Sequence, residues 1–390
     1  MTQSVTLGRK RVTAFFVIDR RSPAWNACSG ERSGGGIGVA LDVLHRWLVA
    51  SGDGAAEGRP YEGVRFDALF VALSVGLMVG LALDFNVHAD GVSFEDEGFW
   101  TAPHVLVYGG GLGLAAVLGS TVLGNRRHVD GWRAAIPVGY GLGLVGLVLF
   151  GVAGGADFVW HTVISHEDTA LEGMTSPPHL GLAVGGGLFL TSPLRAAWRR
   201  EQARGWALLP ALCALSFALS IAVIFTAYLN PLAATQVLWS PHVGRNMGLA
   251  GMVAFPAVLL AVSLALVRRF ELPAGALTLV FLGPGVVSVG TNGNVELLLP
   301  VVAAGLVADC VVAVRRPVPA NPRALRLFGA AVPVTFAASF FATVALWHGL
   351  LPVWTTHLWT GAVAVAGIAG VLLTYAVYPD CRREKRSERS

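Results

Sequence analysis

The chain has 390 residues, of which 54% are hydrophobic and only 13% are charged, and its formal net charge is +4. This composition excludes an ordinary soluble enzyme and is typical of a protein embedded in a membrane. The basic residues stand in short clusters between apolar runs and form no continuous stripe, so we expect no nucleic-acid partner. The partner that the composition predicts is the lipid bilayer.

The first 63 residues differ from the rest of the chain. They carry basic clusters at 9–11 and 20–21 and a run of glycines at 34–36, and they lack an apolar stretch as long as the core of a secretory signal. We interpret residues 1–63 as a flexible cytoplasmic tail; a start codon placed too far upstream is the alternative. Residues 379–390 form a second, basic cytoplasmic tail.

Residues 64–378 predict an all-α, polytopic membrane domain, because about 20 apolar residues suffice to cross a bilayer as a helix. We expect ten transmembrane helices in five hairpins that open toward the exterior. Their approximate ranges are 66–88, 103–124, 134–161, 178–197, 206–228, 243–267, 274–290, 296–314, 327–348 and 356–378.

The distribution of Lys and Arg predicts the orientation, because short cytoplasmic loops are enriched in these residues. In the ten-helix arrangement 27 of the 28 basic residues fall on one side of the membrane, and only Arg245 falls on the other. The chain is therefore predicted to be a multi-pass protein of the plasma membrane with both termini in the cytoplasm.

The seventh predicted helix contains a Gly-Pro-Gly sequence at 283–285, and polar residues follow it. One interpretation is a kink that neighbouring helices tolerate. The other is a broken helix that lines a substrate path, in which Asn292, Asn294 and Glu296 would take part. Glu296 also has a simpler explanation, because a carboxylate is favourable near the N-terminus of a helix.

A short pattern occurs twice in the first four predicted helices. Each copy has an Asp, a His four residues later, an acidic loop and a Pro-His pair. The copies are Asp84-Phe-Asn-Val-His88 with Pro103-His104, and Asp157-Phe-Val-Trp-His161 with Pro178-His179. The Asp and the first His are each displaced by 73 residues between the copies, and the second His by 75. This correspondence predicts that the first two hairpins are a duplication of one hairpin.

The spacing within each copy predicts a metal site. Residues four apart on a helix share one face, so the Asp and the first His can converge on one ion. The His after Pro adds a third ligand, because Pro fits the first helical turn and the positive helix end keeps the imidazole neutral. Imidazole and carboxylate ligands suit copper, zinc, iron or manganese. We expect one or two metal centres near the extracytoplasmic face with the ligands Asp84, His88, His104, Asp157, His161 and His179.

Other polar residues at the same predicted end have open interpretations. Further candidate ligands are His242, His348, His357 and Glu167. The acidic loops that contain Glu95 and Glu167 are otherwise solvated segments without a ligand role. Asp84 and Asp157 could likewise be interfacial residues at helix ends, although a carboxylate there opposes the helix dipole and needs a compensating cation.

The Asp-x3-His sequence at the end of one helix, with a His at the start of the next, resembles the copper-binding motif of a known family. It is similar to the C subunit of the copper membrane monooxygenases, the particulate methane and ammonia monooxygenases. The resemblance covers two short stretches, Asp84–His104 and Asp157–His179. It implies two three-ligand copper sets, a copper-dependent, monooxygenase-like oxidoreductase activity, and cooperation with other membrane subunits or an extracytoplasmic redox partner. Copper is therefore the cofactor we prefer.

Two other classes of function remain open. A membrane transporter or metal-uptake channel would use the acidic outer loops as a funnel and the interrupted seventh helix as a gate. A haem-binding electron carrier would need His pairs that face each other across the bundle. It ranks third, because no His lies in the middle of a predicted helix.

Overall fold

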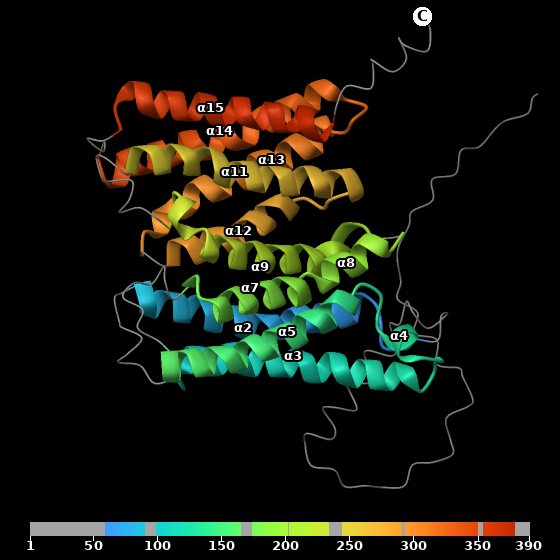
Figure 1. Cartoon of the computed structure of the whole chain (residues 1–390). Coiled ribbons are helices and arrows are strands. Elements are labelled where there is room, and N and C mark those ends of the chain that lie inside the picture. The colour runs from blue at the N-terminus through green and yellow to red at the C-terminus, as the bar shows by residue number, and fades with distance from the viewer. Residues whose placement is uncertain are drawn as a thin grey trace, which may run out of the picture. The chain divides into compact units, whose positions relative to one another are not determined.

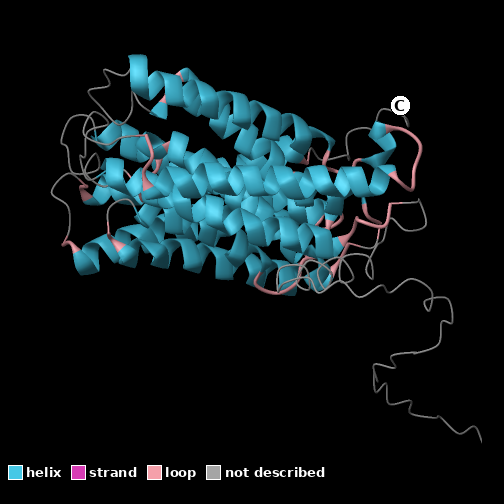
Figure 2. Cartoon of the chain, turned by 90° about the horizontal axis from the view of Figure 1, so that it is seen from below, coloured by secondary structure: helices cyan, strands magenta, loops and turns pink. Residues whose placement is uncertain are grey.

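The computed structural model describes residues 59–89, 99–164, 174–201, 203–233, 244–290, 293–349 and 354–378. This part of the chain contains only helices and their connections, and its long helices run along one common direction (Figure 1 and Figure 2). The predicted tails lie outside the described residues, apart from residues 59–63.

The elements that follow are given in chain order. They are α2 (Val64–Ala89), α3 (Ala102–Arg126), α4 (Trp132–Ala135), α5 (Gly141–Val159), η2 (Trp160–Ile164), α7 (Pro177–Leu190), α8 (Ser192–Arg199), η3 (Gly205–Leu208), α9 (Leu209–Phe225), η4 (Ala227–Leu229), α11 (Gly244–Arg269), α12 (Ala276–Gly290), η5 (Val295–Leu297), α13 (Leu298–Arg315), α14 (Pro322–Trp347) and α15 (Thr356–Val377).

Within the described ranges, nine helical segments are long and apolar enough to cross a membrane. The predicted all-helical, multi-pass architecture is therefore confirmed, but the predicted number of ten long helices is not. The exception is the seventh predicted helix, which is α12, with 15 residues. At 1.5 Å per residue it is about 22 Å long, shorter than the hydrocarbon core of about 30 Å.

The arrangement of the helices agrees only in part with five hairpins. Consecutive helices pack together as α2 with α3, α5 with α7, α12 with α13, and α14 with α15. The third predicted hairpin differs, because α9 packs mainly against α12, whereas α11 packs against α14 and α15. Since α9 also contacts α2 and α7, it joins the first four long helices to α12.

The interpretation of α12 as a broken helix is wrong, since the helix continues through Pro284. Pro has no N–H, so the carbonyl of Val280, four residues earlier, loses its usual helical donor. The hydroxyl of Ser216 on α9 replaces that donor, at 3.2 Å from Val280 O and 3.3 Å from Leu279 O. A neighbouring side chain thus supplies the hydrogen bond that a Pro-containing membrane helix lacks.

The beginning of α12 is held by a carboxylate from the next helix. Asp309 on α13 accepts hydrogen bonds from the backbone N–H groups of Leu277 and Thr278, each at 3.0 Å, and from the hydroxyl of Thr278 at 2.7 Å. A carboxylate is favourable at this position because the first N–H groups of a helix have no partner within it. This contact stabilises the first turn of α12.

Two crossings with matching geometry position the first four long helices. A methyl group added to Gly80 on α2 would come within 2.7 Å of Leu106 Cβ on α3. At the positions displaced by 73 and 75 residues, a methyl added to Gly181 on α7 would come within 2.9 Å of Ala153 Cβ on α5. Each crossing therefore has a glycine where the helix backbones approach closely.

At the opposite end of these helices, a buried carboxylate is fully paired. Asp67 on α2 is 1% exposed, and it accepts from Arg200 at 2.6 Å and from the Tyr140 hydroxyl at 2.7 Å. Burial, and then the adjacent Asp67 carboxylate, raises the pKa of Tyr140 well above its usual range, so the phenol remains a donor. This cluster ties α2 to the start of α5 and to the end of α8.

The Ser216 contact yields a stability prediction. Ser216→Ala should lower the free energy of unfolding in detergent by about 0.6–1.7 kcal/mol, the range for interhelical hydrogen bonds in membranes. Ser120→Ala is the matched control, because the exposed Ser120 hydroxyl donates only to Val117 O within its own helix. Equal stability of the two variants would mean that the hydroxyl does not support the Pro-containing turn.

Candidate metal centre

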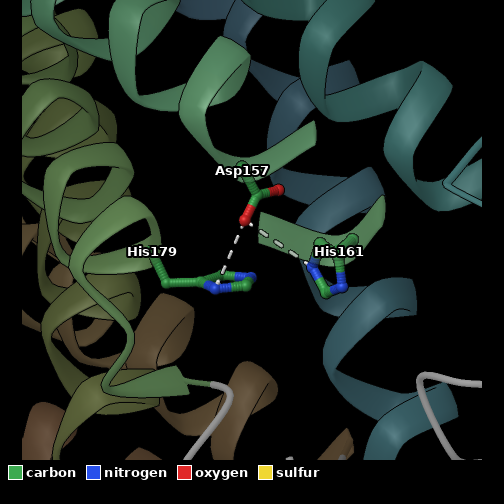
Figure 3. A group of neighbouring side chains, drawn as sticks. All are labelled: Asp157, His161 and His179. Carbon is green, nitrogen blue, oxygen red and sulfur yellow. Dashed lines mark ion pairs between the residues drawn. The ribbon is translucent and has the colours of Figure 1, made fainter. Parts of the chain in front are cut away.

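The predicted ligands of the second hairpin meet in the structure. Asp157 lies in the last turn of α5, His161 lies in the π-helical turn η2 that follows, and His179 lies in the first turn of α7 (Figure 3). One ligand atom of each lies within 4.8 Å of the others, and no other described His, Cys, Asp or Glu joins the three. Single π-helical turns of this kind occur often at functional sites.

The distances suit ligands of a shared ion better than hydrogen bonds. Asp157 Oδ1 lies 3.6 Å from His161 Nε2 and 3.5 Å from His179 Nδ1. These separations exceed the usual hydrogen-bond length of about 2.7–3.2 Å. They are close to the separation of about 3.3 Å expected for two atoms bound to one ion at 2.0–2.1 Å in tetrahedral geometry.

The Asp157 carboxylate is buried, and the ionisable side chains beside it are two imidazole rings rather than a Lys or Arg. Its side chain is fully buried, and within the described residues its Oδ1 accepts no hydrogen bond. The other oxygen, Oδ2, accepts from the Tyr108 hydroxyl of α3 at 2.5 Å. An ionised carboxylate in such a place is costly unless a cation or several donors compensate it. A metal ion beside Oδ1 would supply that compensation.

The local sequence explains how α3 and α7 begin with a histidine. Thr101 and Ser176 are the residues that cap the two helices, and each side chain accepts from the backbone N–H of the His three residues later, His104 and His179. Pro stands in the first turn of both helices. The prediction that each Pro-His pair opens a helix is therefore confirmed.

Both of these His side chains are also oriented through Nδ1. His104 Nδ1 lies 2.6 Å from the backbone carbonyl of Phe99, which can only accept, so this nitrogen carries the proton. His179 Nδ1 lies 2.8 Å from the hydroxyl of Ser176. For His104, whose Nε2 faces Asp84, a hydrogen bond at the other ring nitrogen is typical of His side chains that bind metals. In His179 the bonded Nδ1 is also the nitrogen that lies 3.5 Å from Asp157 Oδ1, so the Ser176 hydroxyl occupies the atom that would bind the ion.

The first hairpin has a related but separate pair. Asp84 Oδ1 on α2 lies 3.2 Å from His104 Nε2 on α3. The pair is adjacent to the other group, because the rings of His104 and His161 lie 6.0 Å apart between centroids, and those of His161 and His179 lie 5.6 Å apart. His88 lies in α2, but its side chain lies outside the described part.

The other candidate residues are not brought to this group. His348 pairs with Glu296 at 2.6 Å, in the second half of the chain. His357 lies exposed in the first turn of α15, and Asn294 lies directly before η5. Among the described residues, the candidate ligands His348 and His357 therefore do not join the group of Asp157, His161 and His179. Three further candidates lie outside the described residues: Glu167, His242 and Asn292.

Sequence reasoning missed Tyr108, which contacts Asp157 from the other hairpin. The available signal was its position four residues after His104, because such residues share a helical face. At the corresponding position of α7, 75 residues later, stands Ala183. The two hairpins therefore differ in this hydroxyl, and only Asp157 receives it.

A scan against models of protein families, a search of curated proteins and a search of solved structures each return no match for this chain.

The burial of Asp157 predicts that the effect of its substitution on thermal stability depends on whether metal is bound. In metal-free protein, Asp157→Asn should leave the Tm unchanged or raise it, because it removes a buried negative charge while Tyr108 can still donate. In wild-type protein, metal at 100 times its Kd should stabilise the fold by about 2.7 kcal/mol, and Asp157→Asn should abolish that gain. Thermal unfolding with and without metal measures both effects.

Asp67→Asn is the matched control for that experiment. Asp67 also accepts from a tyrosine, but Arg200 neutralises it. The substitution should therefore cost about 1.5–3 kcal/mol whether or not metal is present. A large loss of metal-free stability in Asp157→Asn as well would show that the Asp157 charge is compensated by the protein alone.

Proposed function

We propose that this chain is a membrane metalloprotein that binds copper through Asp157, His161 and His179, and that the metal serves an oxidase-like or monooxygenase-like reaction. The observation that carries the proposal is the buried Oδ1 of Asp157 with two imidazole rings beside it. Two imidazoles and one carboxylate suit copper, and zinc, iron or manganese are the alternatives. The oxidative chemistry rests on the resemblance of the motif to the copper membrane monooxygenases.

Bound copper would supply one-electron and O2 chemistry. The protein's own contribution is orientation and exclusion of water. The Tyr108 hydroxyl holds one oxygen of Asp157, which leaves the other oxygen for the ion. Leu77, Val107 and Phe150 provide apolar walls beside the site. Electrons would come from an extracytoplasmic redox partner or from other membrane subunits.

Transport is the second class of function, and we rank it below the metalloprotein. The proposed gate was a break in α12, but this helix is continuous and its Pro turn is bonded to α9. A haem-binding electron carrier ranks third. We propose that the activity lies at the end of α5 and the start of α7.

We further propose that the first two hairpins are duplicated and that both chain termini lie in the cytoplasm. The matching crossings at Gly80 and Gly181 support the duplication. The basic residues support the orientation. Arg126 and Arg269 end α3 and α11, and Arg200 follows α8, whereas His104 and His179 stand at the starts of α3 and α7.

Metal content tests the proposed function. In protein purified in native-like lipid, His161→Ala and His179→Ala should each remove most of one bound metal equivalent, because loss of a ligand exceeds the 10–100-fold effect of outer contacts. His128→Ala is the control, since this exposed His lies beyond the other end of α3. Elemental analysis identifies the metal. Unchanged metal content would refute the site, and loss of metal without a change in O2 consumption would refute the oxidase.

Cysteine labelling tests the orientation. In a variant without Cys28, Cys213, Cys310 and Cys381, a cysteine at Trp100 should react with a membrane-impermeant reagent from outside intact cells. A cysteine at Gly131 should react only after the cells are opened. Reaction of both from the same side would contradict the arrangement.

A further inference from the structure

A groove lies where α14 and α15 pack against each other, in the second half of the chain. Its volume is about 210 Å³. One side is lined by Ala338, Ala342 and Ala345 of α14, which recur every three or four residues and so share one helical face. Ala338 and Ala342 are exposed. The groove therefore opens to the outside of the bundle, where a membrane protein meets lipid.

Aromatic side chains line the other side of the groove. They are Phe341 of α14, Trp354, which directly precedes the cap residue of α15, and Trp359 near the start of that helix. The centroid of the Phe341 ring lies 5.0 Å from that of Trp354 and 6.2 Å from that of Trp359. Apart from the two indole N–H groups, the lining side chains are hydrocarbon, so the groove suits a mainly apolar occupant.

The indole of Trp354 carries a donor without an acceptor. The residue is 4% exposed, and its buried Nε1 has no hydrogen-bond partner among the described residues. A buried N–H that stays unpaired is costly, and a buried Trp usually finds a partner for it. Since the Trp354 side chain forms part of the groove wall, an occupant with a carbonyl oxygen would supply the acceptor.

The start of α15 adds a preference for negative charge beside this donor. Thr355 caps the helix, but its hydroxyl accepts no hydrogen bond, whereas Thr101 and Ser176 accept from N–H groups of α3 and α7. The first N–H groups of a helix favour an anion such as phosphate. Trp354 precedes Thr356 by two residues, so their Cα atoms lie at most about 7 Å apart. One molecule can therefore reach both places.

We propose that the groove binds one phospholipid. An acyl chain lies along the alanines of α14, an ester carbonyl accepts from the indole N–H of Trp354, and the phosphate lies at the start of α15. A phospholipid carries these three groups in the same order as the groove, the donor and the helix start. Trp is enriched at the membrane interface, at the level of lipid headgroups. The site is independent of the proposed metal centre, which lies in the first half of the chain.

Two matched lipids test the contact with the carbonyl. The full chain, purified in detergent and stripped of lipid, is titrated with dioleoyl phosphatidylcholine or with its ether analogue. The analogue has the same chains and headgroup but no carbonyl oxygens. Native mass spectrometry should show that wild-type protein binds the ester lipid about 3–10-fold more tightly, the range for one hydrogen bond. Equal affinities would overturn the proposal.

Substitutions locate the site. Trp354→Phe keeps an aromatic ring and removes the donor, so it should bind the two lipids equally. Trp347→Phe is the matched control and should keep the preference, because Trp347 is exposed and does not line the groove. Ala342→Leu fills the groove and should weaken the binding of both lipids about tenfold, because the chain loses apolar contacts.

The contrary results are specific. A preference for the ester lipid that survives in folded Trp354→Phe, or full affinity in folded Ala342→Leu, would overturn the site. Thermal unfolding verifies that each variant is folded. If Trp354→Phe does not fold, the comparison of the two lipids on wild-type protein and on Ala342→Leu decides.

Nuclear magnetic resonance gives a second readout at the donor itself. In ¹⁵N-labelled protein, the indole signal that is missing from Trp354→Phe belongs to Trp354. Its proton should move downfield when the ester lipid is added and less with the ether lipid, because a hydrogen bond to a carbonyl deshields the proton. An N–H directed instead at the Phe341 ring would give an upfield signal that neither lipid moves, and this result would overturn the proposal.

Discussion

The buried carboxylate of Asp157 is the constraint around which one end of the first four long helices, the end opposite Asp67, is organised. A negative charge without exposure must be met by donors or cations, and the described protein provides one hydroxyl and two imidazole rings. Those groups come from three places in the chain, α3, η2 and α7. The helices must therefore be held at fixed distances, and the close crossing at Gly181 provides this for α5 and α7.

Asp67 and Asp157 are buried aspartates at opposite ends of these helices, and their charges are balanced in different ways. Asp67 is equally removed from solvent, and it also accepts from a tyrosine, but Arg200 balances its charge. That arrangement is complete and needs no ligand. The Asp157 group has imidazole rings where Asp67 has a guanidinium. Imidazole can be neutral, so the group can accept a cation in a way that the Asp67 cluster cannot.

Much of the fold could be predicted from the sequence, because apolar length alone identifies membrane helices. The start of α12 and its continuity through Pro284 could not, since they depend on Asp309 and Ser216, which belong to other helices. The Asp157, His161 and His179 group was predictable, because helical spacing and a Pro-His start are local properties. The contact of Tyr108 and the remoteness of His348 were not, because both depend on which helices become neighbours.

The crossings at Gly80 and Gly181 place the glycine on different partners. In one it belongs to the first helix of the pair and faces Leu106, and in the other it belongs to the second and faces Ala153. The separation of the helices therefore depends on the combined volume of two facing side chains rather than on either one. If α2 and α5 are compared residue by residue, Gly80 of α2 corresponds to Ala153 of α5, and the two residues differ. A comparison of the pairs would find a glycine at both crossings, contributed by the first helix in one pair and by the second helix in the other.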